Sequence, residues 1–240
     1  MSEWYQQHDR HYLAVDNIIF GYDEKVLKIL LIKRKFEPEQ GNWSLMGGFV
    51  KAGESLEAAA ARVVFDLTGL ADVFMEQLKA YGEVDRDPEA RTGSITYYTL
   101  IRADLYESDM GQLHGAEWFP VESLPTLIFD HPQMVAHALA VLRQKTRTQP
   151  IGFELLAEKF TLPQLRMLYE AIHQTELDPG NFSKKVKKMR LLTQLNEKDK
   201  SESKKGAFYF RFDKTRYESL KAQGFYFDLN GFLKNRPQTE

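Results

Sequence analysis

Short apolar runs and alternating apolar and polar residues dominate the first half of the chain, a pattern typical of β-strands. Residues 12–21 and 26–34 are predicted to pair as two strands, because the turn-like sequence YDEK separates them. Further strands are expected over residues 73–87, 94–105 and 115–125. Residues 55–68 are rich in alanine, lack Gly and Pro, and precede Gly69, so they are predicted to form a helix among these strands.

The second half of the chain changes from strand periodicity to helix periodicity. A helix is expected over residues 132–145, with Asp130 as a possible N-cap. Residues 146–150 contain a proline and no apolar periodicity. This segment is therefore expected to link two domains.

Beyond the linker, the pattern predicts three helices followed by a β-hairpin. A short helix over residues 151–160 precedes one that begins at Thr161, where Gln164 completes a capping box. The third helix begins after Asp178, with a proline at its first position. Two strands then flank a polar loop at 198–206, which gives the order of a winged helix-turn-helix.

The composition is that of a globular protein and excludes several kinds of chemistry. Its 240 residues fit one large or two modest domains. The absence of cysteine excludes disulfides, thiolate metal sites and a cysteine nucleophile. No apolar run approaches the roughly 18 residues of a membrane span, and residues 1–12 lack a secretory pattern, so a cytoplasmic protein without a membrane partner is expected.

Charge is distributed unequally between the two halves. Residues 1–150 hold 15 Lys and Arg against 22 Asp and Glu, a net charge of −7. Residues 151–240 hold 17 against 12, a net charge of +5. A basic domain attached to an acidic one suggests that the basic domain has a polyanionic partner.

The third helix of the second half has an apolar stripe and a lysine-rich face. A lysine run alone is usually a solvated surface, but here it follows a predicted helix and precedes a basic hairpin tip. Such a helix suits the major groove of double-stranded DNA, and Ser183 and Lys184, near its start, are the expected base readers. The candidate DNA contacts are Ser183, Lys184, Lys185, Lys187, Lys188 and Arg190 on the helix, with Lys198, Lys200, Lys204 and Lys205 on the hairpin.

Residues 48–70 carry a spaced motif that resembles the Nudix box, G-x5-E-x7-R-E-U-x-E-E-x-G-U, where U is aliphatic. The matching positions are Gly48, Glu54, Arg62, Val64, Gly69 and Leu70. In that family the glutamates after the arginine bind divalent metals, and here Val63, Asp66 and Leu67 replace them. Because residues 63 and 67 share one helix face and are both aliphatic, no metal, no cofactor and no hydrolysis are expected. Met46 also replaces the usual proline of the preceding loop.

The resemblance implies an effector cleft beside the motif helix. The candidate residues for this cleft are Asp16, Lys33, Trp43, Met46, Gly48, Phe49, Asp85 and Arg86. Trp43 is equally compatible with stacking on a ligand and with a place in the core. Asp16 and Asp85 are expected to bind hydroxyl groups, because a buried carboxylate without a partner is costly.

The arginines near this cleft allow two interpretations. Arg86 and Arg91 are suited to holding a diphosphate. Alternatively, the pairs Asp85–Arg86 and Asp87–Arg91 form surface salt bridges. His131 is expected to be structural rather than catalytic.

As a whole, the chain resembles the Nudix-related transcriptional regulators over residues 10–222. The expected fold is α+β, with a Nudix-like mixed sheet and flanking helices over 1–147, a winged helix-turn-helix over 151–222, and a tail, 223–240, that packs on an unspecified surface. Members of this family sense ADP-ribose or sugars, and the sequence WSLMGGFV favours the L-arabinose-responsive members.

The function implied is therefore a sugar-responsive regulator, expected to bind a palindromic operator as a homodimer. Two alternatives remain open. The first is an ADP-ribose sensor that controls NAD metabolism, and the second is a weak Nudix hydrolase with an accessory nucleic-acid-binding domain. An RNA-binding module fits less well, since no aromatic-bearing sheet platform is predicted.

Overall fold

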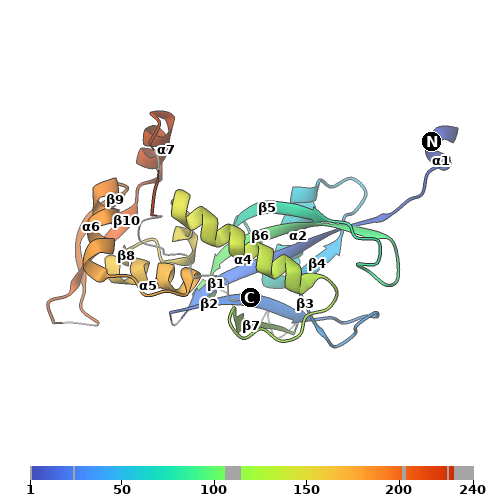
Figure 1. The fold of residues 1–240 in the computed structure, drawn as a ribbon, viewed down its shortest axis with the longest axis horizontal. Coiled ribbons are helices and arrows are strands. Elements are labelled where there is room, and N and C mark those ends of the chain that lie inside the picture. Colours follow the sequence, from blue (N-terminus) through green and yellow to red (C-terminus); the bar gives the residue numbers. More distant parts are fainter. Residues whose placement is uncertain (1, 24, 106–114, 202–203, 226, 230–240) are drawn as a thin grey trace. The chain divides into compact units, whose positions relative to one another are not determined.

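The computed structural model describes residues 2–23, 25–105, 115–201, 204–225 and 227–229. The chain forms two compact units, of which the first comprises residues 1–21 and 28–138 and the second residues 22–27 and 139–240. Figure 1 shows a sheet with helices in the first unit, and small helices with a hairpin in the second. The predicted α+β class is confirmed.

The Nudix-like part is built on a mixed sheet. Its strands are β1 (Tyr12–Asp23), β2 (Val26–Lys33), β3 (Trp43–Ser44), β4 (Met46–Phe49), β5 (Phe74–Tyr81), β6 (Thr92–Arg102) and β7 (Ala116–Pro120). The main strand order is β3-β2-β1-β6-β5, while β4 pairs with β1 and β7 with β2. The short strands β3 and β4 are not predicted by the sequence pattern, because neither is long enough to show alternation.

The helices of this part are α1 (Glu3–Gln6), α2 (Leu56–Thr68), the 3₁₀ turn η1 (Ala103–Leu105) and α4 (His131–Thr148). Helix α2 agrees with its prediction: the Ser55 side chain accepts from the Ala58 N–H, and Gly69 ends the helix with φ 73°. Its residues Ala59, Ala60, Val63 and Val64 belong to one buried cluster with Val15 and Ile19 of β1 and Leu30 of β2.

The winged helix part follows the predicted order. Its elements are η2 (Phe153–Leu155), β8 (Phe160–Thr161), α5 (Leu162–His173), α6 (Pro179–Met189), β9 (Leu192–Asp199), β10 (Ala207–Phe212) and α7 (Lys214–Ala222). The capping box of Thr161 and Gln164 is present, and Asp178 caps α6. The predicted helix over 151–160 is wrong in extent, since its only helical part is the turn η2, and strand β8 begins at Phe160.

The boundary between the two units lies within α4 rather than in the predicted linker. Arg143 donates to the Ile172 carbonyl oxygen at 2.8 Å, and Thr146 Oγ1 lies 2.9 Å from His173 Nε2. These bonds attach the second half of α4 to the end of α5. The tail also packs here: Phe227 and Leu229 are buried in the winged helix core.

Candidate functional site

A cavity of about 240 Å³ opens in the first unit, between β1, the β3–β4 segment and the start of α4. Five of the predicted ligand residues line it, namely Asp16, Lys33, Gly48, Phe49 and Arg86. Sequence reasoning missed other lining residues, among them Arg34, Lys35, Phe36, Ser44, Thr92, Phe129 and His131. Most of these lie in loops or at strand ends, where no periodicity indicates which way a side chain points.

Strand alternation brings Asp16 to the floor of the cavity. Val15 packs in the cluster under α2, so the next side chain, Asp16, lies on the opposite face of the sheet. In the antiparallel pair of β1 and β4, Asp16 stands opposite Gly47. A Cβ atom at Gly47 would lie 2.2 Å from Asp16 Oδ1, so only glycine leaves room for this carboxylate.

Three predicted cleft residues lie elsewhere. Met46 is fully buried in the α2 cluster. Trp43 packs edge-on against Phe119, with ring centroids 4.7 Å apart, and Lys33 Nζ lies 5.0 Å from the Trp43 ring centroid. Asp85 is exposed in the loop after β5. These three residues therefore do not line this cavity: Met46 is buried in the core, Trp43 packs against Phe119, and Asp85 is exposed to solvent.

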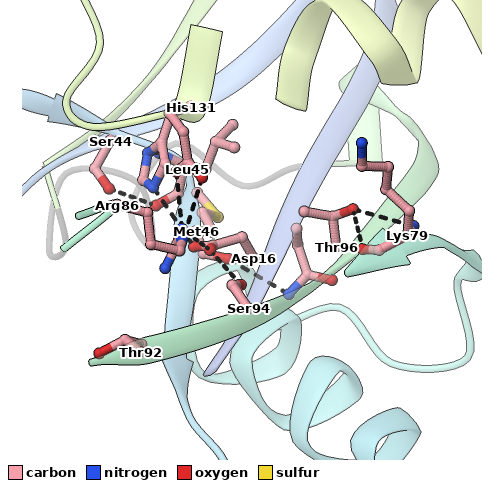
Figure 2. Close-up of polar contacts among 12 residues, drawn as sticks. Asp16, Ser44, Leu45, Met46, Lys79, Arg86, Thr92, Ser94, Thr96 and His131 are labelled. Carbon is pink, nitrogen blue, oxygen red and sulfur yellow. Dashed lines mark hydrogen bonds and ion pairs between the residues drawn. The ribbon is translucent and has the colours of Figure 1, made fainter. Parts of the chain in front are cut away.

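Arg86 is the centre of a buried ionic cluster. Its Nε and Nη2 donate to the two carboxylate oxygens of Asp130 at 2.9 and 2.8 Å, and Nη2 lies 3.6 Å from Asp16 Oδ2. Ser94 Oγ donates to the same Asp16 oxygen at 2.6 Å. Figure 2 shows Arg86, Ser94 and His131 gathered around Asp16. Asp130 stands directly before α4, where its carbonyl oxygen accepts from the Met134 N–H, and its carboxylate forms this bidentate ion pair.

The structure gives both arginines partners other than the carboxylates of the expected surface salt bridges. Arg86 is 8% exposed and bonds Asp130, which is distant in sequence, instead of Asp85. Arg91 Nη1 donates to the carbonyl oxygens of Gly82 and Glu83. Neither predicted surface pair is present among the ion pairs of the described residues.

His131 has a structural bond, as expected, and also faces the cavity. Its Nδ1 accepts from the Leu45 N–H at 3.1 Å, and its Nε2 lies 3.8 Å from Asp16 Oδ1. Burial lowers the pKa of His131, although Asp16 and Asp130 act in the opposite direction. A neutral imidazole that accepts at Nδ1 carries its proton on Nε2.

The Nudix motif keeps its frame without its metal ligands. Arg62 donates to Glu54 from Nε at 2.9 Å and from Nη2 at 2.6 Å, and the Lys51 N–H donates to the same carboxylate. The hydrogen bonds from Arg62, and then that from Lys51, lower the pKa of Glu54 to about 2. These bonds hold the motif loop against α2.

The three substituted positions do not form a site for a divalent cation. Val63 is 4% exposed in the core, and Leu67 lines the cavity with an aliphatic side chain. Asp66 is exposed and lies 3.8 Å from Arg62 Nη1. No group of three or more His, Asp or Glu side chains within the described ranges is placed to hold a metal ion. The residues here do not fit the Mg²⁺ that Nudix chemistry requires.

In the second unit, the predicted DNA-contacting residues lie on α6, at its C-terminal end, and on the β9–β10 hairpin. Lys184, Lys187 and Lys188 are exposed on α6, whereas Phe182 and Val186 are buried beneath it. Lys185 Nζ lies 3.8 Å from Asp228 Oδ2.

Ser183 lies near the start of α6, as expected, and is half-buried. Two other members of the predicted set occupy different positions from those expected. Arg190 ends the helix with φ 56° instead of lying on it. Lys198 lies within β9, with its Nζ 4.4 Å from the Phe208 ring centroid, and is therefore not at the loop tip. Lys200, Lys204 and Lys205 are exposed in the loop as expected.

No helix in the described part of the chain has both the length and the apolar character needed to cross a membrane.

Comparison with known proteins identifies both domains. Residues 10–138 match the NUDIX domain, and residues 152–212 match the NrtR DNA-binding winged helix domain. The ADPR responsive transcriptional repressor NtrR of Acinetobacter baylyi is 30% identical over 210 residues, which cover 86% of this chain and 84% of that protein. An ADP-ribose pyrophosphatase of Methanocaldococcus jannaschii is 40% identical over 124 residues, covering 51% of this chain and 70% of that enzyme.

A solved structure of Shewanella oneidensis NrtR complexed with a 27mer DNA is 28% identical, with a TM-score of 0.76, and covers 83% of this chain and 93% of that one. The expected closeness to arabinose-responsive members is not supported, because a relative that aligns with 86% of this chain is named for ADP-ribose. The chain belongs to the NrtR-like family of regulators, in which a Nudix domain precedes an NrtR-type winged helix domain.

Proposed function

We propose that this protein is a DNA-binding transcriptional regulator whose Nudix domain binds ADP-ribose and thereby changes its affinity for an operator. The observation that carries the proposal is the similarity to an ADP-ribose-responsive repressor, which extends through both domains. ADP-ribose thus replaces the L-arabinose expected from sequence resemblance.

The cavity has groups suited to such a ligand. Lys33, Arg34 and Lys35 line it together, and cationic side chains favour a diphosphate. Phe36 and Phe49 also line it and are 59% and 52% exposed, so each offers an aromatic face to a purine ring.

The winged helix domain supplies the DNA contacts in this proposal. Helix α6 enters the major groove through its exposed lysines, and the β9–β10 hairpin meets the neighbouring phosphates. A homodimer would place two such helices about 34 Å apart on a palindromic operator. ADP-ribose changes operator affinity only if it binds one state of the dimer more tightly than the other.

The test uses duplex DNA selected from a random pool by the full-length protein. Fluorescence anisotropy of that DNA is measured while ADP-ribose or L-arabinose is added. We expect ADP-ribose to change DNA affinity by about 5- to 150-fold, the usual range of allosteric coupling, and L-arabinose to have no effect. A response to L-arabinose alone would contradict the proposed effector, and failure to select any DNA would contradict the regulator itself.

A second candidate is hydrolysis of ADP-ribose, which the similarity to an ADP-ribose pyrophosphatase favours. We expect no turnover, because Val63 and Leu67 provide no carboxylate and Asp66 points to solvent beside Arg62. Phosphorus NMR of ADP-ribose incubated with the protein and Mg²⁺ tests this. If the wild type removes the diphosphate signal and an Asp66→Ala variant does not, the protein is an enzyme.

A further inference from the structure

The chain reverses its direction directly after α7, at Gly224. This residue has a φ of 84°, a left-handed conformation that glycine adopts without strain. Its N–H donates to the Lys221 carbonyl oxygen at 3.0 Å, and the Phe225 N–H donates to that of Leu220 at 2.9 Å. These bonds end α7, and the residues that follow return to the winged helix core.

Residues 227–229 pack on this core with alternating burial. Phe227 and Leu229 are 5% and 1% exposed and belong to one apolar cluster with Phe182 of α6. Between them, the side chain of Asp228 is 43% exposed. Burial of the two apolar side chains stabilises the segment on the domain, and it leaves the carboxylate of Asp228 at the surface.

A backbone hydrogen bond also fixes this segment. The Leu229 N–H donates to the Arg147 carbonyl oxygen at 2.9 Å. Arg147 lies in the last turn of α4, where carbonyl oxygens have no partner within the helix. Asp228 is thus held between two anchored neighbours, so its carboxylate loses little conformational freedom when it pairs with a cation.

The cation beside Asp228 is Lys185 of α6. Its Nζ lies 3.8 Å from Asp228 Oδ2, and its side chain is 31% exposed. Residues three apart on a helix are neighbours, so Lys185 and the exposed Lys188 share one edge of the lysine-rich face. A DNA phosphate that reaches this edge meets the carboxylate of Asp228 beside the ammonium group of Lys185, and the two anions repel each other.

We propose that Asp228 makes an autoinhibitory contact, in which it competes with DNA phosphates for Lys185 and so lowers the affinity of the winged helix domain for DNA. This inference rests on the proposed DNA contacts of α6. Asp228 lies outside residues 152–212, which match the NrtR DNA-binding winged helix domain, so the restraint comes from a part of the chain beyond that match. Because an exposed ion pair is weak, DNA displaces Asp228 at a modest cost, and the inhibition is partial.

The test compares DNA binding by the full-length wild type and by an Asp228→Asn variant. Fluorescence anisotropy of duplex DNA selected by the wild type is measured at several salt concentrations. We expect Asp228→Asn to bind this DNA about 2- to 5-fold more tightly, which is the effect of releasing one exposed ion pair. The slope of log affinity against log salt should steepen by up to about one, because Lys185 then makes a full phosphate contact.

Three further variants separate the ion pair from other effects. Glu218→Gln removes an exposed carboxylate of α7 and is the control for net charge; it should change DNA affinity by less than about 2-fold, because salt screens charges outside the contact. Asp228→Glu keeps the charge and should keep the wild-type affinity. In a Lys185→Ala background, Asp228→Asn should have no more effect than Glu218→Gln, because the partner is absent.

Two results would overturn the autoinhibitory contact while the DNA-binding function stands. The first is that Asp228→Asn binds DNA more weakly than the wild type or only as well as Glu218→Gln. The second is that its gain in affinity persists in the Lys185→Ala background. A wild type that selects no DNA would overturn the proposed function and this inference together. If urea denaturation shows that Asp228→Asn is destabilised, Asp228→Ser replaces it in the same comparison.

Discussion

Arg62 binds the carboxylate of Glu54 through two hydrogen bonds, 2.9 Å from Nε and 2.6 Å from Nη2. In this chain that pair stabilises the geometry of the Nudix motif in the absence of its metal ligands. Hydrogen bonds to the ionised form lower a carboxyl pKa, and the pKa of Glu54 is about 2.

Removing the Arg62 side chain should therefore raise the pKa of the Glu54 carboxyl group. We expect the pKa of Glu54 in an Arg62→Gln variant to rise toward its ordinary value of 4.5. A carbon-detected NMR titration of Glu54 measures it. A pKa that stays near 2 would show that the Lys51 N–H, rather than Arg62, sets it.

Restoring the family glutamates should lower stability strongly at one position of α2 and hardly at all at another. Val63 is buried in the core, so Val63→Glu leaves a carboxylate without a partner and should lower the free energy of unfolding by at least about 3 kcal/mol. Asp66 is exposed, so Asp66→Glu should change that free energy by less than about 0.5 kcal/mol. Urea denaturation of both variants gives the comparison. Equal stability of the two would mean that Val63 is not enclosed as described.

Glycine is predicted to be the only residue type tolerated at position 47, opposite Asp16. Gly47→Ala places a methyl group 2.2 Å from Asp16 Oδ1, which is held by its neighbours. We expect a loss of roughly 1–3 kcal/mol in stability, and weaker ADP-ribose binding. Gly82→Ala is the control, because a Cβ there meets nothing within 4 Å and the backbone is not left-handed. Thermal unfolding and calorimetry measure both effects, and a Gly47→Ala protein indistinguishable from Gly82→Ala would refute the steric argument.

His173 should make the stability of the second unit depend on pH. Burial, followed by the charges of Arg147 and Arg143, lowers its pKa from 6.5 to about 3. Between these values the unfolded state binds more protons than the folded state, so stability falls as the pH falls from 6.5 toward 3. The slope contributed is at most about 1.4 kcal/mol per pH unit. In His173→Gln that contribution should be absent, which urea denaturation at pH 7, 6 and 5 would detect as a flatter profile.

Helix α6 is predicted to carry the principal DNA contacts. The double variant Lys184→Ala with Lys185→Ala should bind selected DNA more weakly, and each lost phosphate contact should reduce the slope of log affinity against log salt by about one. ADP-ribose affinity should not change. Lys51→Ala with Lys79→Ala, two exposed lysines of the first unit, is the matched control. Unchanged DNA affinity in the α6 variant would place the DNA contacts elsewhere.

Local features of the sequence determined the elements that depend on near neighbours. The helix that ends at Gly69, the Thr161–Gln164 capping box and the cap of α6 at Asp178 arise from interactions within a few residues, and the structure contains all three. The replacement of two of the three metal-binding glutamates of the Nudix motif by Val63 and Leu67 is also a property of the sequence alone. The same holds for the basic character of α6.

Tertiary structure decided what those elements bring together. Asp16 and Asp130 lie 114 positions apart, yet both contact Arg86, and no periodicity relates three side chains from a strand, a loop and a helix start. Met46 and Gly47 are adjacent, but strand alternation places the first in the core and the second beneath the cavity carboxylate. The sequence determined which chemical groups are present, whereas the pairing of β1 with β4 and β6 determined which of them share one buried site. The physical reason is that a buried polar atom needs a partner, and here the partners are distant along the chain.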